Sequence, residues 1–171
     1  MWQAIQSLLS NGSSVVRRRS RASTFSANGN GGGSTAQVIV VGLLADNHDR
    51  HLLANVSSGN GWVVHFVDSL AATLAAAASF RVPVILCDRD LLGADWREAV
   101  SRLASSSLPT CVILVSRAAD GCLWEEVIRS GGYEVLSRPL RPEEVIRVIK
   151  LAWSFWNSML KMPAYSGKRS V

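Results

Sequence analysis

The chain has 171 residues, of which 48% are hydrophobic and 18% are charged. This length and composition favour one globular domain and exclude a chain that is disordered throughout. No apolar run approaches the roughly 18 residues that a membrane helix needs, so we expect no transmembrane segment. The net charge of +5 is concentrated at the two ends, because residues 1–36 carry four arginines and no acid and residues 161–171 carry three basic residues.

The first segment with secondary-structure periodicity begins at Gln37. Residues 11–36 are mostly Ser, Gly, Asn and Arg, a composition that is typical of a flexible linker. We therefore predict that residues 1–36 form a disordered basic tail that is dispensable for folding. The predicted domain covers residues 37–154, and residues 155–171 are expected to form the end of a helix and a second basic tail.

Five short runs of β-branched and other apolar residues predict strands. They are continuously apolar rather than alternating, which is typical of strands buried on both faces of a sheet. The predicted strands are Val38–Val41, Trp62–Val67, Val82–Cys87, Thr110–Val115 and Tyr133–Leu136.

Five helices are predicted between and after these strands. Capping residues support several of them, with Ser69 and Asp120 as N-caps, Gly131 and Gly132 as a stop, and Pro142 at a first-turn position. A cluster of small polar residues at Ser57–Gly61 predicts a turn. The predicted helices are Asp49–Val56, Ser69–Phe80, Asp95–Ser105, Asp120–Arg129 and a last helix from Pro142 to about Leu160.

The alternation of strands and helices predicts the fold class. It is typical of an α/β fold with a parallel sheet that is covered by helices on both faces. At this chain length we expect a flavodoxin-like, doubly wound, five-stranded parallel sheet of order 2-1-3-4-5. In such a sheet, ligands bind at the carboxyl ends of the strands.

Three polar residues stand at those carboxyl ends. Asp88 follows the third predicted strand, Ser116 follows the fourth, and Arg138 follows the fifth. Because these strands are neighbours in the expected sheet, a carboxylate, a hydroxyl and a cation should converge. Arg117 lies next to Ser116 and is a second candidate cation for the same pocket.

These residues and their spacing resemble the response-regulator receiver domains of chemotaxis-type signalling. The resemblance covers about residues 37–154. It implies that Asp88 accepts a phosphoryl group from a histidine kinase, that Ser116 contacts this group, and that Arg138 stands where a lysine is usual. The segments that carry the resemblance are Val84–Asp88, Val112–Ser116, Gly131–Gly132 and Ser137–Leu140.

The chain departs from the receiver pattern in ways that indicate a degenerate member. Receivers end the first strand with two acids that hold magnesium, and counting from Val41 those places hold Gly42 and Leu43. Asp88 alone is a poor magnesium site, because Mg²⁺ needs several oxygen ligands in a near-octahedral arrangement. Asp46 and Asp90 are the remaining candidate metal ligands, so we predict no assured cofactor and at most weak binding of Mg²⁺.

Arg117 and Arg138 could neutralise the Asp88 carboxylate in place of a metal ion. A guanidinium binds a carboxylate through two parallel hydrogen bonds. We therefore expect Arg138, with Arg117 as a second candidate, to hold Asp88 in an ion pair.

Three functions remain open from the sequence. The first is a cytoplasmic response regulator of a two-component phosphorelay, a phosphoprotein modified on Asp88 that lacks an output domain and signals to a histidine kinase or another protein. The second is a pseudo-receiver that is not phosphorylated and acts as a protein-interaction module. The third is a nucleic-acid or membrane-surface adaptor that works through the basic tails. None of the three is an enzyme.

Two groups of apolar residues have structural interpretations. Cys87, Cys111 and Cys122 show no disulfide or zinc spacing, and small core side chains in a reducing compartment are the expected role. Trp153, Phe155 and Trp156 form either part of the core or an exposed apolar patch for a partner.

Overall fold

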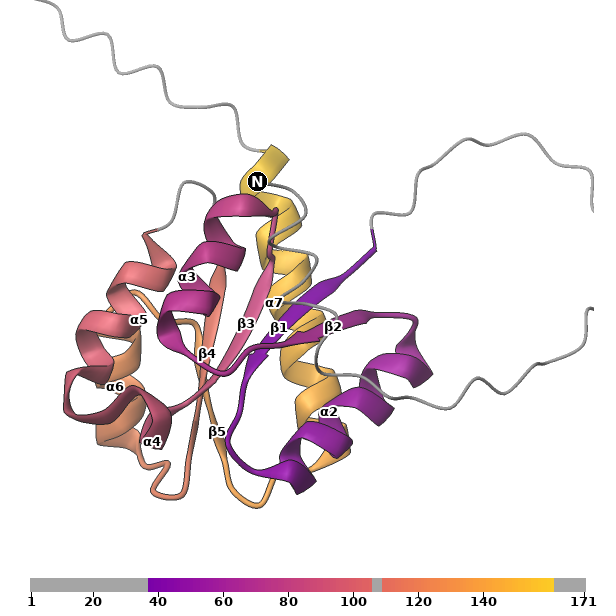
Figure 1. Ribbon diagram of the computed structural model, residues 1–171. Coiled ribbons are helices and arrows are strands. Elements are labelled where there is room, and N and C mark those ends of the chain that lie inside the picture. The colour runs from indigo at the N-terminus through magenta and orange to yellow at the C-terminus, as the bar shows by residue number, and fades with distance from the viewer. Residues whose placement is uncertain (1–36, 106–108, 162–171) are drawn as a thin grey trace, which may run out of the picture. The chain divides into compact units, whose positions relative to one another are not determined.

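A computed structural model describes residues 37–105 and 109–161 of the chain. Five parallel strands form one sheet in the order β2-β1-β3-β4-β5, which confirms the predicted topology (Figure 1). Each strand is joined to the next by a helical connection, as parallel pairing requires. The strands are β1 (Ile39–Leu43), β2 (Val63–Phe66), β3 (Val84–Asp88), β4 (Cys111–Ser116) and β5 (Glu134–Ser137).

The helices confirm most of the predicted caps. Ser69 accepts a hydrogen bond from the backbone N–H of Ala72, and Asp120 accepts one from the N–H of Leu123, so each satisfies a free donor of a first turn. The helical elements are α2 (Asn47–Asn60), α3 (Leu70–Ser79), α4 (Arg89–Leu92), the 3-10 turn η1 (Gly93–Asp95), α5 (Trp96–Ala104), α6 (Gly121–Arg129) and α7 (Pro142–Lys161).

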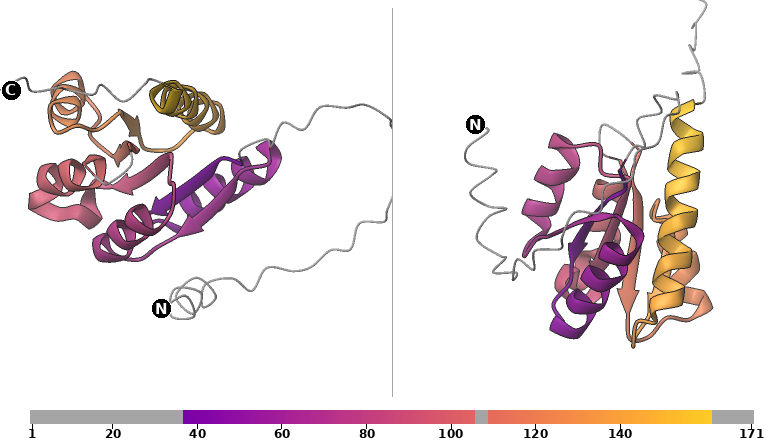
Figure 2. Two further views of the ribbon diagram at one scale, coloured as in Figure 1. Left: turned by 90° about the horizontal axis from the view of Figure 1, so that it is seen from above. Right: turned by 90° about the vertical axis from the view of Figure 1, so that its right-hand side faces the viewer.

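The helices form two layers that bury the sheet between them. On one face, α2 and α7 pack side by side over a core that includes Leu53, Leu86 and Ile149 (Figure 2). On the other face, α3, α5 and α6 cover a second core that includes Ile85, Leu103 and Val127. Alternate residues of the central strands therefore enter different cores, which explains why β3 and β4 are buried along their whole length.

The predicted turn at Ser57–Gly61 is wrong. Residues up to Asn60 continue α2, because Val56 and Ser57 are buried beneath the helix and tertiary packing overrides the weak helix propensity of Ser, Gly and Asn. The helix ends at Gly61, whose φ of 70° is left-handed and whose N–H bonds the carbonyls of Ser57 and Ser58.

Two other boundaries differ from the prediction and affect the carboxyl edge of the sheet. Strand β1 extends to Leu43, so Gly42 and Leu43 are strand residues paired with β3, and Leu44 and Ala45 are the first residues beyond the strand. Neither is acidic, and Leu44 is buried. After β3, the short helix α4 begins at once, with Asp88 as its N-cap.

The aromatic residues of α7 divide between the core and the surface. Trp156 is buried and donates a hydrogen bond from Nε1 to the carbonyl of Pro109. Trp153 is half-buried and stacks on Trp156, with 5.2 Å between the ring centroids. Phe155 is exposed and contacts Tyr133. Trp156 therefore belongs to the core, whereas Phe155 is part of the exposed apolar surface.

The three cysteines are expected to differ in reactivity. Burial raises the pKa of the Cys87 thiol to about 12, and burial also raises that of Cys111 to about 12, whereas Cys122 is exposed. Because the thiolate is the reactive form, we expect iodoacetamide near neutral pH to modify Cys122 alone in the folded chain and all three thiols in urea. Mass spectrometry of the labelled chain measures this. Rapid modification of Cys87 or Cys111 without denaturant would contradict the described core.

The predictions for the tails concern residues 1–36 and 162–171, which lie outside the described residues. The part of the last helix that is described continues to Lys161. Within residues 37–105 and 109–161, no helix combines the length and the apolar character needed to cross a membrane.

Candidate functional site

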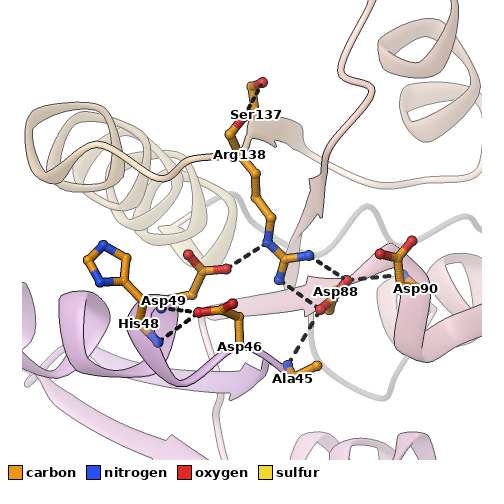
Figure 3. A network of polar contacts seen from close by, with 8 residues as sticks. All are labelled: Ala45, Asp46, His48, Asp49, Asp88, Asp90, Ser137 and Arg138. Atoms are coloured by element: carbon orange, nitrogen blue, oxygen red, sulfur yellow. Dashed lines mark hydrogen bonds and ion pairs between the residues drawn. The ribbon is translucent and has the colours of Figure 1, made fainter.

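The carboxyl edge of the sheet contains a network of ionic side chains (Figure 3). Its centre is the guanidinium of Arg138, which lies between two carboxylates. Its Nη2 is 2.7 Å from Oδ2 of Asp88 and its Nη1 is 3.2 Å from Oδ1 of the same side chain. Its Nε donates to Oδ2 of Asp49 at 2.7 Å. One side chain thus bonds two acids from different elements.

Asp88 is placed for this role by the end of β3. The continuous apolar sequence of β3 buries the strand on both faces, and Asp88, as its last residue, is only 1% exposed. Each carboxylate oxygen also accepts a backbone hydrogen bond, Oδ1 from the N–H of Asp90 at 3.0 Å and Oδ2 from the N–H of Ala45 at 3.4 Å. Both oxygens of Asp88 therefore have two donors each.

Arg138 reaches the site from the segment that follows β5. Its backbone N–H bonds the carbonyl of Ser116 at 3.0 Å, which continues the pairing of β4 with β5 by one residue. Burial alone would lower the pKa of Arg138, but its hydrogen bonds to Asp88 and Asp49 and the charges of these acids raise that pKa above its ordinary value. The guanidinium is therefore permanently charged in this site.

Asp49 is the member of the network that sequence reasoning did not assign to the site. It lies in the first turn of α2 and is 3% exposed. Its position follows from Asp46, whose side chain caps α2 by accepting the backbone N–H groups of His48 and Asp49. An acid three residues after an Asp N-cap is a sequence signal for a first-turn carboxylate facing the same end of the helix.

The two candidate metal ligands, Asp46 and Asp90, do not contact the guanidinium of Arg138 in the described hydrogen bonds. The hydrogen bonds from Asp49 and His48 lower the pKa of the Asp46 carboxyl, so this side chain is a charged helix cap. Asp90 is exposed, and only its backbone N–H contacts Asp88. Within the described part of the chain, no group of three His, Cys, Asp or Glu side chains is arranged to hold a metal ion. With Arg138 paired to both buried carboxylates, the described residues therefore do not fit a receiver-type Mg²⁺ site.

The structure brings together some of the predicted pocket residues and separates others. Asp88 and Arg138 are in direct contact. Ser116 is buried at the end of β4, but the hydrogen bonds described for its Oγ join it to the backbone of Ala118. Arg117 is exposed, and no ion pair of the described residues includes it. The second cation expected beside Asp88 is therefore absent from the described network.

The amino-acid sequence matches no model of a protein family and no curated protein. Solved structures, in contrast, show clear similarity. The signal receiver domain of an HD domain-containing protein from Pseudomonas fluorescens Pf-5 superposes with a TM-score of 0.68 at 20% identity, over 78% of this chain and 99% of that chain. A response regulator from Thermotoga maritima gives a TM-score of 0.63 at 14% identity, over 69% and 98% of the two chains.

A third similar structure contains a metal ion. It is the receiver domain of a sensor histidine kinase from Pseudomonas aeruginosa PAO1, with a magnesium ion coordinated in its active-site cleft. Its TM-score is 0.59 at 16% identity, over 70% of this chain and 99% of that chain. The strand order, the helical layers and these three similarities together show that the described part of this chain has the fold of response-regulator receiver domains.

Proposed function

We propose that this chain is a receiver-type signalling module of a two-component pathway that acts by binding a protein partner and does not take up a phosphoryl group on Asp88. One observation carries this proposal. The resemblance to receivers makes Asp88 the expected phosphoacceptor, yet its carboxylate is buried and both of its oxygens accept hydrogen bonds from Arg138. The nucleophile that phosphorylation requires is thus already engaged.

The chemistry of phosphoryl transfer supports this reading. A carboxylate that attacks a phosphoryl donor needs a free oxygen in line with the phosphorus, and the negative charges that meet there need cations to neutralise them. Among the described residues drawn in Figure 3, the carboxylates of Asp46, Asp49 and Asp88 lie near one guanidinium, that of Arg138. A phosphoryl group would add negative charge where acids already outnumber the cation.

The same network supports a constitutive binding surface. Arg138 ties the segment after β5 to β3 through Asp88 and to α2 through Asp49. That segment leads into α7, which with α6 presents large apolar side chains to solvent, namely Trp124, Ile128, Leu151 and Phe155. A histidine kinase or another signalling protein is the expected partner, and its binding would not depend on a phosphorylation state.

A phosphorylated response regulator is the second candidate function. It is favoured by the placement of Asp88 at the end of β3 and of Ser116 at the end of the adjacent strand β4. In this case a donor would have to displace Arg138 from Asp88 before transfer.

Incubation with acetyl phosphate and MgCl₂, followed by intact-mass measurement, separates the two functions. We expect no phosphoryl adduct on the wild-type chain under conditions that modify an active receiver in a parallel reaction. The variant Arg138→Lys removes the bidentate pairing but keeps a cation, and any adduct that it gains should disappear in Arg138→Lys combined with Asp88→Asn. An adduct on the wild-type chain that is lost in Asp88→Asn would overturn the proposal in favour of the second function.

A further inference from the structure

The guanidinium of Arg138 is a cation shared by two buried carboxylates. It bonds the carboxylates of Asp49 and Asp88, with Asp46 beside them, at the carboxyl edge of the sheet (Figure 3). One similar receiver domain coordinates a magnesium ion in its active-site cleft. We propose that Arg138 is a built-in cation that replaces the divalent ion of the site and thereby makes this chain independent of divalent metal. The proposal concerns the occupant of the site and goes beyond the signalling role proposed above.

The first support is the way in which the guanidinium satisfies the acids. Asp49 and Asp88 are both buried, and a buried carboxylate needs a charged or hydrogen-bonding partner. All three nitrogen atoms of the guanidinium donate hydrogen bonds, Nε to Asp49 and the two Nη atoms to Asp88. The planar fork of arginine matches this arrangement, whereas a metal ion would need further oxygen ligands.

The second support is the sequence of the loop after β1. Leu44 and Ala45 follow the strand, and what Ala45 offers Asp88 is a backbone N–H rather than an oxygen ligand. An N–H aimed at the carboxylate stabilises an anion but repels a metal cation. Leu44 and Ala45 therefore assist Arg138 through this hydrogen bond to Asp88 and supply no acidic side chain.

The third support is that Arg138 is held in place by its own chain. Its backbone N–H bonds the carbonyl of Ser116, and its side chain extends directly from that anchored position to Asp88. A tethered cation has a high effective concentration at its site, so free Mg²⁺ competes with it poorly. Without Arg138, the buried carboxylates of Asp49 and Asp88 would lose the cation that they share.

The test compares binding of Mn²⁺, as the probe ion, to the wild-type chain and to Arg138→Gln by isothermal titration calorimetry. We expect no saturable binding of Mn²⁺ to the wild-type chain. Arg138→Gln should bind one ion, and its affinity should be at least about tenfold higher than any weak binding that the wild-type chain shows. Arg141→Gln, which neutralises a neighbouring exposed arginine, is the matched control and should bind no ion. Arg138→Gln combined with Asp88→Asn or Asp49→Asn should lose the gained binding.

Thermal unfolding of the wild-type chain gives an independent readout that does not require the variant to fold. We expect the same melting temperature in EDTA and in millimolar Mn²⁺, because Arg138 already pairs with both buried carboxylates. A rise of about 5 degrees or more with Mn²⁺ that is lost in Asp88→Asn would show metal binding beside Arg138 and would overturn the proposal. A folded Arg138→Gln variant that binds no Mn²⁺ would also overturn it. Either result is distinct from the phosphorylation test, which measures covalent modification of Asp88.

Discussion

The variant Arg138→Ala is expected to lower the free energy of unfolding by about 3 kcal/mol, because it leaves two buried carboxylates without their shared cation. The side chain of Arg138 is largely buried, and those of Asp49 and Asp88 are buried almost completely, so water cannot replace the lost bonds without opening the site. Urea denaturation followed by circular dichroism measures the change. The effect should exceed that of Asp88→Asn, since the amide still accepts hydrogen bonds and the freed arginine can turn towards water.

A matched surface variant separates this effect from the loss of any arginine. Arg147 is exposed on α7, and Arg147→Ala should change the free energy of unfolding by no more than about 0.5 kcal/mol. If Arg138→Ala were as mild as Arg147→Ala, the ion pairs of Arg138 would contribute nothing to stability. The network would then be too weak to keep Asp88 from a phosphoryl donor, which would also weaken the proposed function.

The second large effect is expected for Trp156→Ala, at about 4 kcal/mol of destabilisation. Trp156 is 5% exposed, packs in the core between α7 and the sheet, and bonds the carbonyl of Pro109 through its indole N–H. Its removal creates a cavity, ends the stacking with Trp153 and leaves a backbone carbonyl without that donor. The same urea titration measures the loss.

Phe155→Ala is the control for this variant. Phe155 is the preceding residue of the same helix, but it is 49% exposed, so its truncation should cost about 1 kcal/mol or less. A similar loss for both variants would mean that α7 does not bury the face described here. Phe155→Ala also tests the proposed surface, because it should weaken partner binding while leaving the fold intact.

The sequence by itself determined the architecture and the two residues of the central ion pair, Asp88 and Arg138. Continuous apolar runs that alternate with helices are typical of a covered parallel sheet, and the commonest order of such a sheet at this chain length, 2-1-3-4-5, is the one observed. The same order brings the ends of β3 and β5 to one edge of the sheet. This explains why Asp88 and Arg138 could be paired in advance although 50 residues separate them.

The tertiary structure alone decided which of the other charged residues join this pair. Arg117 and Arg138 are both arginines at strand ends, but Arg117 is exposed, whereas the side chain of Arg138 is largely buried against Asp49 and Asp88. Asp49 enters the site because capping by Asp46 starts α2 two residues earlier than predicted and sets the rotation of its first turn. Likewise, Trp156 is buried and Phe155 exposed because adjacent helical positions point about 100° apart. Local patterns specify elements and their order, whereas side-chain direction at element ends depends on packing between segments that are distant in the sequence.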